Sequence, residues 1–70
     1  MTRYLVVYEQ GEDGGWGAYS PDLEGCVAVG KSREEVERLM AEAIPFHIEG
    51  LREAGLDVPE PERNIGYVAL

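Results

Sequence analysis

The first residues of the chain carry a run of β-forming side chains in which both alternating sets are apolar. Over residues 3–10, one set is Tyr4, Val6 and Tyr8, and the other is Leu5 and Val7. A strand with one face in solvent alternates apolar with polar residues, so this pattern indicates a strand that is buried on both sides. We therefore predict a strand over residues 3–10, in a sheet whose two faces are both covered.

Turn-forming residues divide the next part of the chain into two short strands. Residues 11–15 read GEDGG, and Asp-Gly readily supplies the positive φ that a hairpin turn requires. Residues 16–20 form the return strand, after which Ser20-Pro21-Asp22 reverses the chain, because proline fixes φ at a turn position. A third strand is predicted over residues 26–29, which read CVAV.

A helix is predicted to begin after Ser32. The sequence Ser32-Arg33-Glu34-Glu35 is a capping box, in which the serine oxygen accepts a backbone hydrogen bond and Glu35 reaches back. The glutamates also lie where the helix dipole favours negative charge. We expect the helix to run to about residue 54 and to end at Gly55.

Apolar side chains recur with helical spacing between residues 36 and 54. At 100° per residue they form one stripe, which consists of Val36, Leu39, Met40, Ala43, Ile44, His47, Ile48, Leu51 and Ala54. Pro45 falls on the opposite, solvent-facing side, and the stripe continues in phase across it. Because a proline on that side bends a helix toward the core, we predict one bent helix rather than two.

The last part of the chain contains a linker and a fourth apolar segment. Residues 56–63 include two prolines and show no helical period, and residues 64–70 have the pattern of a strand. The predicted order is β-β-β-α-β, an α+β fold with a small, mainly antiparallel sheet and one long helix packed on one face. No repeat or second domain is visible, so residues 1–70 are predicted to form a single domain.

The length of the chain limits the core that it can bury. Domains of 70 residues usually gain stability from disulfides, a metal or a partner subunit. Cys26 is the only cysteine, which excludes an internal disulfide and fits a reducing compartment. We therefore expect a homo-oligomer, a dimer or a tetramer, in which a second copy covers the sheet face that the helix leaves open.

The hydropathy of the chain also bears on its location. The apolar run near the N-terminus is too short for a signal peptide, and no stretch is long enough to span a bilayer. A cytoplasmic location without membrane contact is expected.

The charge of the chain indicates the kind of partner that it would bind. Fourteen acidic residues against six Lys and Arg give a net charge of −8. Phosphate backbones are bound by Lys and Arg, so direct binding of nucleic acid is not expected. A basic protein fits better, since opposite fields speed association, although the charge also serves solubility alone. The candidate partner contacts are the acidic residues in the two predicted turns, Glu12, Asp13, Asp22 and Glu24.

Two residues suggest catalysis, and each has a simpler explanation. Cys26 opens a strand with no charged neighbour in sequence, which is typical of a packed thiol rather than an activated nucleophile. His47 is the only histidine and lies on the apolar stripe, where a core or interface position is more usual than a base or a metal ligand. We predict no catalytic residue, no metal site and no cofactor.

The octapeptide from Gly25 to Ser32 matches the spacing of a phosphate-binding loop, G-x-x-x-x-G-K-S. Its four central residues are strand formers, whereas a phosphate loop must present backbone amides to the ligand. Such a loop also belongs to a much larger parallel sheet than 70 residues can build. We therefore interpret Gly30 and Lys31 as the exit of a strand.

Taken in order, the segments YEQGEDGGWGAYS, PDLEGCVAVGKSREEV, EAI and GLDVPEP resemble the HicB-like antitoxin family. The positions that fall on the family pattern are Pro21, Asp22, Leu23, Gly25, Cys26, Gly30, Ser32, Glu34, Glu35, Gly55, Val58, Pro59 and Pro61. Each piece is weak alone, but the ordered set is specific and covers nearly the whole chain.

The resemblance implies a partial RNase H-like fold without the acidic metal site of a nuclease, and therefore no catalysis. It implies a small basic partner of the HicA type, a toxin that cleaves messenger RNA and is inhibited by the antitoxin. Many members carry a C-terminal DNA-binding domain, which these 70 residues lack, so operator binding is not expected. One alternative is a stand-alone oligomeric binding or scaffold module; another is a small hydrolase using Cys26 or His47.

Overall fold

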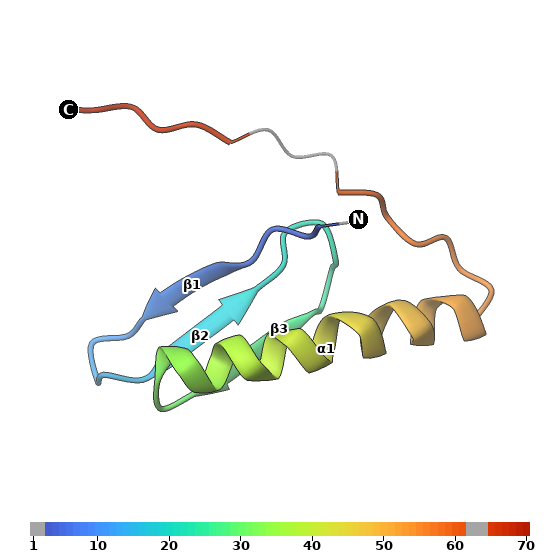
Figure 1. Cartoon of the computed structure of the whole chain (residues 1–70), viewed down its shortest axis with the longest axis horizontal. Helices are drawn as coiled ribbons and strands as arrows, with labels where there is room; N and C mark the ends of the chain where they lie inside the picture. The colour runs from blue at the N-terminus through green and yellow to red at the C-terminus, as the bar shows by residue number, and fades with distance from the viewer. Residues whose placement is uncertain (1–2, 62–64) are drawn as a thin grey trace.

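The computed structural model describes residues 3–61 and 65–70 and contains three strands and one helix (Figure 1). The elements are β1 (Val7–Gln10), β2 (Trp16–Tyr19), β3 (Val27–Gly30) and α1 (Arg33–Glu53). Both strand pairs are antiparallel, and the order in the sheet is β1-β2-β3. The helix packs on β2 and β3. The predicted α+β class, with an antiparallel sheet followed by one long helix, is confirmed.

The strand register assigns the side chains to two faces of the sheet. Tyr8, Ala18 and Ala28 are aligned across the three strands, and all three belong to the core or pack against it. The next aligned row, Val7, Tyr19 and Val27, points to the opposite face because successive residues of a strand alternate. The helix therefore packs on the side of the sheet to which Tyr8, Ala18 and Ala28 point.

The core lies between the sheet and the first half of α1. Its fully buried apolar members are Ala18, Leu23, Cys26, Val36 and Met40. Val36 and Met40 come from the predicted helical stripe, and Ala43, Ile44 and Ile48 pack around them. The core also confirms that Cys26 is a packed thiol.

The turn between β2 and β3 supplies two of the five core residues. The Leu23 amide donates to the Ser20 carbonyl at 3.1 Å, and the Cys26 amide donates to the Leu23 carbonyl at 3.1 Å. Gly25 has a φ of +82°, in the left-handed region that favours glycine. These bonds fold the turn inward, so that Leu23 becomes one of the most buried side chains of the protein.

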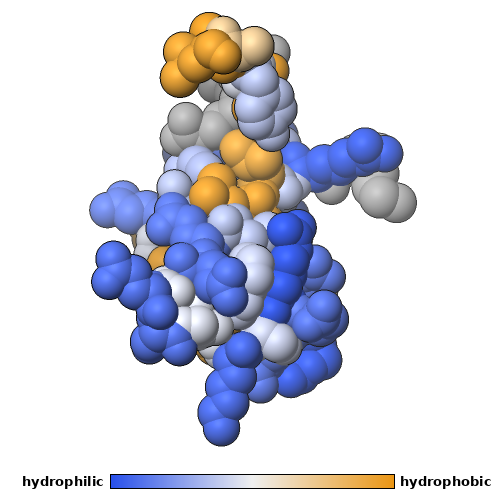
Figure 2. Space-filling view, turned by 90° about the vertical axis from the view of Figure 1, so that its left-hand side faces the viewer, coloured by the Kyte–Doolittle hydropathy of each residue, from blue (hydrophilic) through white to orange (hydrophobic). Residues whose placement is uncertain are grey.

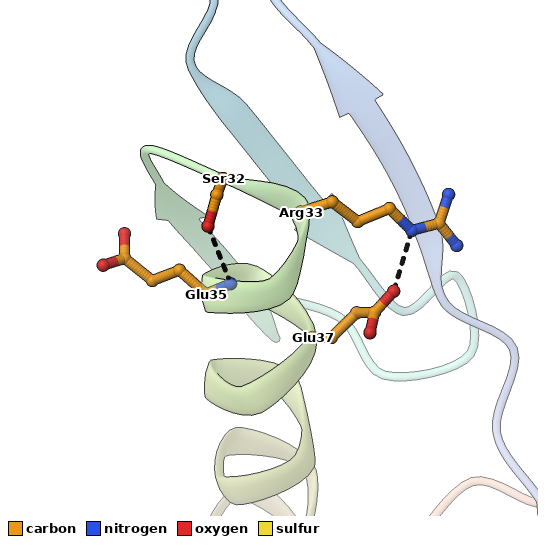
Figure 3. Close-up of polar contacts among 4 residues, drawn as sticks. All are labelled: Ser32, Arg33, Glu35 and Glu37. Atoms are coloured by element: carbon orange, nitrogen blue, oxygen red, sulfur yellow. Dashed lines mark hydrogen bonds and ion pairs between the residues drawn. The ribbon is translucent and has the colours of Figure 1, made fainter.

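The start of α1 is the predicted capping box with one difference (Figure 3). The Ser32 hydroxyl accepts a hydrogen bond from the Glu35 amide at 3.1 Å. The Glu35 carboxylate bonds backward at 2.8 Å, but to the amide of Lys31 rather than to that of Ser32. A Cβ on Gly30 would overlap this carboxylate, so a side chain there would displace Glu35 from the Lys31 amide.

The end of α1 agrees with the sequence. Ala54 is the C-cap and Gly55 follows with a φ of +74°. The Gly55 amide donates to the Arg52 carbonyl, and the Leu56 amide to the Leu51 carbonyl, which is a Schellman motif. Pro45 is exposed inside a continuous helix, so the prediction of one helix is confirmed.

Three predicted strands have different bounds in the structure. The second differs by one residue, since β2 ends at Tyr19 rather than at residue 20. The first was predicted over residues 3–10, but β1 comprises only Val7–Gln10. Val7 is paired with Tyr19, the last residue of β2, so residues 3–6 extend beyond the end of their neighbour and have no ladder to join. The third strand begins at Val27 instead of Cys26, whose amide and carbonyl serve the preceding turn.

The predicted fourth strand over residues 64–70 is not formed. Residue 64 lies outside the described residues, and residues 65–70 have no strand pairing and are all exposed. A strand requires a hydrogen-bonded neighbour, and Figure 1 shows this segment apart from the sheet. The sequence pattern shows that these residues favour a strand. It does not show whether the edge of a sheet is available to pair with them.

Candidate functional site

One face of the sheet is open and apolar. We call the open face the side chains on the side of the sheet away from α1, which are Val7, Glu9, Gly17, Tyr19, Val27 and Val29. Val27 and Val29 expose 64% and 76% of their surface, and Tyr19 exposes 40%. Within the described residues, no element covers this face, whereas the sequence predicted cover on both sides. A contiguous exposed apolar patch of this kind is typical of an interaction surface.

Two shallow hollows border the open face, one at each end of the strands. The first lies under the β1–β2 hairpin and is lined by residues that include Glu9, Asp13 and Val29. The second lies against the β2–β3 turn and includes Tyr19 and Glu24. Each hollow thus combines open-face apolar groups with a carboxylate from a turn.

The four predicted partner contacts do not form a single patch. Glu12 and Asp13 lie in the turn after β1, whereas Asp22 and Glu24 lie in the turn after β2. Consecutive turns of an antiparallel sheet lie at opposite ends of its strands, which are about 13 Å long at four residues each. The structure therefore brings each pair together but separates the two pairs.

The members of each pair differ in their surroundings. Glu12 and Glu24 are exposed, and Asp22 is half-buried. The Asp13 carboxylate accepts a hydrogen bond from the Gly15 amide at 2.9 Å, so it shapes the hairpin as well as contributing charge.

The hairpin end carries further carboxylates beyond the predicted contacts Glu12 and Asp13. Trp16 is aligned with both Gln10 and Gly30, so the hairpin and the start of α1 lie at the same end of the sheet (Figure 1). Glu34 and Glu37 are exposed there. We call this region the acidic end; its carboxylates are Glu9, Glu12, Asp13, Glu34, Glu35 and Glu37. Strand parity alone predicts this arrangement, because the third strand of an antiparallel sheet ends where the first does.

Arg33 partly compensates this charge and joins two elements. Its Nε lies 2.8 Å from the Glu37 carboxylate, an ion pair between exposed groups one helical turn apart (Figure 3). Its guanidinium also lies 4.4 Å from the centre of the Tyr8 ring on β1. In Figure 2, which faces this end, hydrophilic residues predominate over the hairpin and the helix start, and a separate hydrophobic group lies above them.

The residues considered for catalysis lie in unremarkable surroundings. Burial raises the pKa of the Cys26 thiol above its ordinary value of 9.0, so the thiol is protonated at neutral pH. His47 is half-buried on α1. Among the described residues, no group of three His, Cys, Asp or Glu side chains is placed to hold a metal ion.

No described helix is long and apolar enough to cross a bilayer.

The comparison with known families is decisive. The profile of a family described as the HicB-like antitoxin of bacterial toxin–antitoxin systems matches residues 4–69. The chain belongs to the HicB-like antitoxin family. The UPF0150 protein ssr1765 of Synechocystis sp. is 37% identical over 62 residues, which cover 89% of this chain and 78% of the relative. No solved structure matches the chain, so the RNase H-like part of the fold prediction stays a prediction.

The structure gives a physical explanation for the PDLEGC segment of this HicB-like chain. Pro21 and Asp22 begin the turn, and Leu23 and Cys26 fill the core, while Gly25 adopts the positive φ between them. This segment, which carries part of the sequence resemblance, is thus a core-forming turn. The general role of the family to which the chain belongs is that of an antitoxin.

Proposed function

We propose that the chain binds and inhibits a small basic RNA-cleaving toxin, of the HicA type, and has no catalytic activity of its own. The observation that carries this proposal is the acidic end, where residues 9–13 and 31–37 hold six carboxylates and only two cationic side chains, Lys31 and Arg33. The family supports an antitoxin role in general, and the surface charge supports a basic partner. A cytoplasmic location and a single domain over residues 1–70 belong to the same proposal.

The toxin would be held mainly by electrostatic complementarity. Carboxylates on an exposed turn accelerate association with a basic surface and orient it. Glu12 and Asp13 lie within the acidic end and are both exposed, so we rank them as the primary contact. Asp22 and Glu24 lie at the opposite end of the sheet, and Asp22 is half-buried, so we rank them as the secondary contact.

The experiment uses the basic protein encoded in the reading frame adjacent to this one. Its affinity for the chain is measured by calorimetry, and its cleavage of a messenger RNA is measured with and without the chain. The Glu12→Lys/Asp13→Lys variant should weaken binding at least tenfold, mainly through a lower association rate, and should restore cleavage. The matched control, Glu49→Lys/Glu53→Lys at two exposed positions in the second half of α1, makes the same change of net charge.

Three outcomes would contradict parts of this proposal. Equal losses in the two double variants would show that net charge alone acts and that the hairpin is not the contact. A larger loss in Asp22→Lys/Glu24→Lys would move the contact to the other turn. The absence of an adjacent basic protein, or full toxin activity in the presence of the chain, would favour the stand-alone module.

A second proposal concerns self-association, and the open face is the observation that favours it. We infer that a second copy covers Tyr19, Val27 and Val29, since these exposed apolar side chains carry no charge that a basic toxin would select. Sedimentation at tens of micromolar should give at least a dimer, and Val29→Glu should shift it toward the monomer. A wild-type monomer would refute this proposal without bearing on toxin binding.

A further inference from the structure

Residues 65–70 form an apolar segment that pairs with no strand among the described residues. They read IGYVAL and contain no charged side chain, in a protein of which 29% of the residues are charged. Tyr67 and Val68 expose 98% and 87% of their surface, and Ile65 and Leu70 are also largely exposed. Exposed segments rich in β-forming residues readily add to a sheet edge.

The sheet offers a free edge on the same side of the molecule. β1 is an outer strand, so the backbone groups on its outer side have no neighbouring strand among the described residues. Residues 4–8 are apolar on both alternating sets, and residues 65–70 have the same character. A strand added to this edge would therefore place apolar side chains on both the open face and the helix-covered face.

A hydrogen bond attaches the linker after α1 close to this edge. The Tyr4 hydroxyl donates to the Pro59 carbonyl at 2.7 Å, so the linker after α1 is attached beside the residues that lead into β1. Pro59 and Pro61 favour an extended backbone at their own positions. In Figure 1, the segment runs beyond this attachment and lies apart from the sheet of its own chain.

We propose that residues 65–70 form a β-strand on the outer edge of β1 in a second copy of the chain. Two copies exchange these strands reciprocally, which gives a two-fold dimer. Charge supports this occupant, because two chains of net charge −8 repel one another least when they meet through surfaces without charged side chains. Residues 65–70 and 4–8 have no charged side chain, so they offer no specific electrostatic attraction to a basic partner. This proposal rests on the proposed self-association and identifies the segment that drives it.

Cross-linking between cysteines tests the exchange directly. In a Cys26→Ala background, one chain carries Leu5→Cys and a second, longer-tagged chain carries Val68→Cys. The two are mixed, unfolded, refolded and treated with a short bis-maleimide. A covalent heterodimer is expected, and the control pair, Glu49→Cys with Val68→Cys, should give less than a tenth of it. Circular dichroism of each variant establishes that it is folded.

The Leu5→Cys/Val68→Cys double variant separates exchange from pairing within one chain. A cross-linked monomer as its main product would overturn the proposal, because the segment would then lie on its own β1. Absence of the heterodimer in the mixed experiment would overturn it as well. A cross-linked dimer supports the exchange.

Val68→Pro provides a second test that does not depend on cross-linking. Proline removes an N–H and disrupts a ladder, yet position 68 is exposed and unpaired in the single chain, so its folding should not change. The dimer should dissociate at least tenfold more readily than that of the wild type. If Val68→Pro leaves the dimer intact while Val29→Glu breaks it, self-association stands and strand exchange is wrong.

Discussion

Replacing Leu23 by alanine tests whether the β2–β3 turn is part of the core. Leu23 exposes 1% of its surface, although it lies in a connection between strands. Its backbone hydrogen bonds do not involve the side chain, so alanine keeps the turn and removes only buried apolar atoms. The next residue, Glu24, is exposed and provides the matched control, Glu24→Ala.

The expected loss is large relative to the total stability. Removing a fully buried leucine side chain costs about 3–5 kcal/mol, which combines the lost transfer free energy with the cavity left behind. A 70-residue protein has roughly 3.5–10 kcal/mol in all, from about 0.05–0.15 kcal/mol per residue. A loss of about 3 kcal/mol corresponds to a fall in Tm of about 12–24 °C for a domain of this size.

Urea unfolding followed by far-UV circular dichroism measures this loss. All variants are compared at one protein concentration, because self-association would otherwise shift the midpoint. Glu24→Ala should stay within about 0.5 kcal/mol of the wild type. A loss of less than about 1 kcal/mol in Leu23→Ala would show that the side chain is not buried as described, and the structural explanation of the PDLEGC segment would fail.

Three smaller perturbations test the helix and the thiol. Ser32→Ala should lower the free energy of unfolding by about 1 kcal/mol by removing the cap, and Ser32→Asp should restore most of it in the same urea assay. Gly55→Ala should lower the free energy of unfolding by about 1–2 kcal/mol, because φ at Gly55 is +74°. Gly50→Ala inside α1 should raise it by about 0.5–1 kcal/mol. If both substitutions changed the free energy of unfolding in the same direction, the assigned cap would be wrong. The raised pKa of Cys26 stabilises the fold below pH 9, and this contribution should be lost as the pH rises above 9, where the unfolded thiol ionises first. Cys26→Ala should lack that decline, and a matching pH profile would be evidence against burial of the thiol.

The helix was predictable because its signals are local. Ser32 and Glu35 are three residues apart, and Gly55 acts through carbonyls of the preceding turn. Pro45 was also assigned correctly, since the phase of the apolar stripe places it on the solvent side. Such interactions depend on neighbours within four or five positions, which the sequence displays directly.

Long-range contacts explain what the sequence did not show. Leu23 is a single apolar residue in a turn, and periodicity carries no information about such a position. Residues 65–70 have the composition of a strand, but the existence of a strand depends on an edge elsewhere. The separation of Glu12 from Glu24, by contrast, follows from antiparallel connectivity and was open to prediction.

The placement of the core under only one half of α1 has a consequence for motion. Val36 and Met40 are fully buried in the first half, whereas the residues beyond Met40 are half-buried or exposed, and the helix projects past the strands (Figure 1). Backbone amides exchange with solvent at rates set by the free energy of local opening. The last turns of α1 therefore open and close many times for each global unfolding event, while the turns around Val36 exchange only when the whole fold opens.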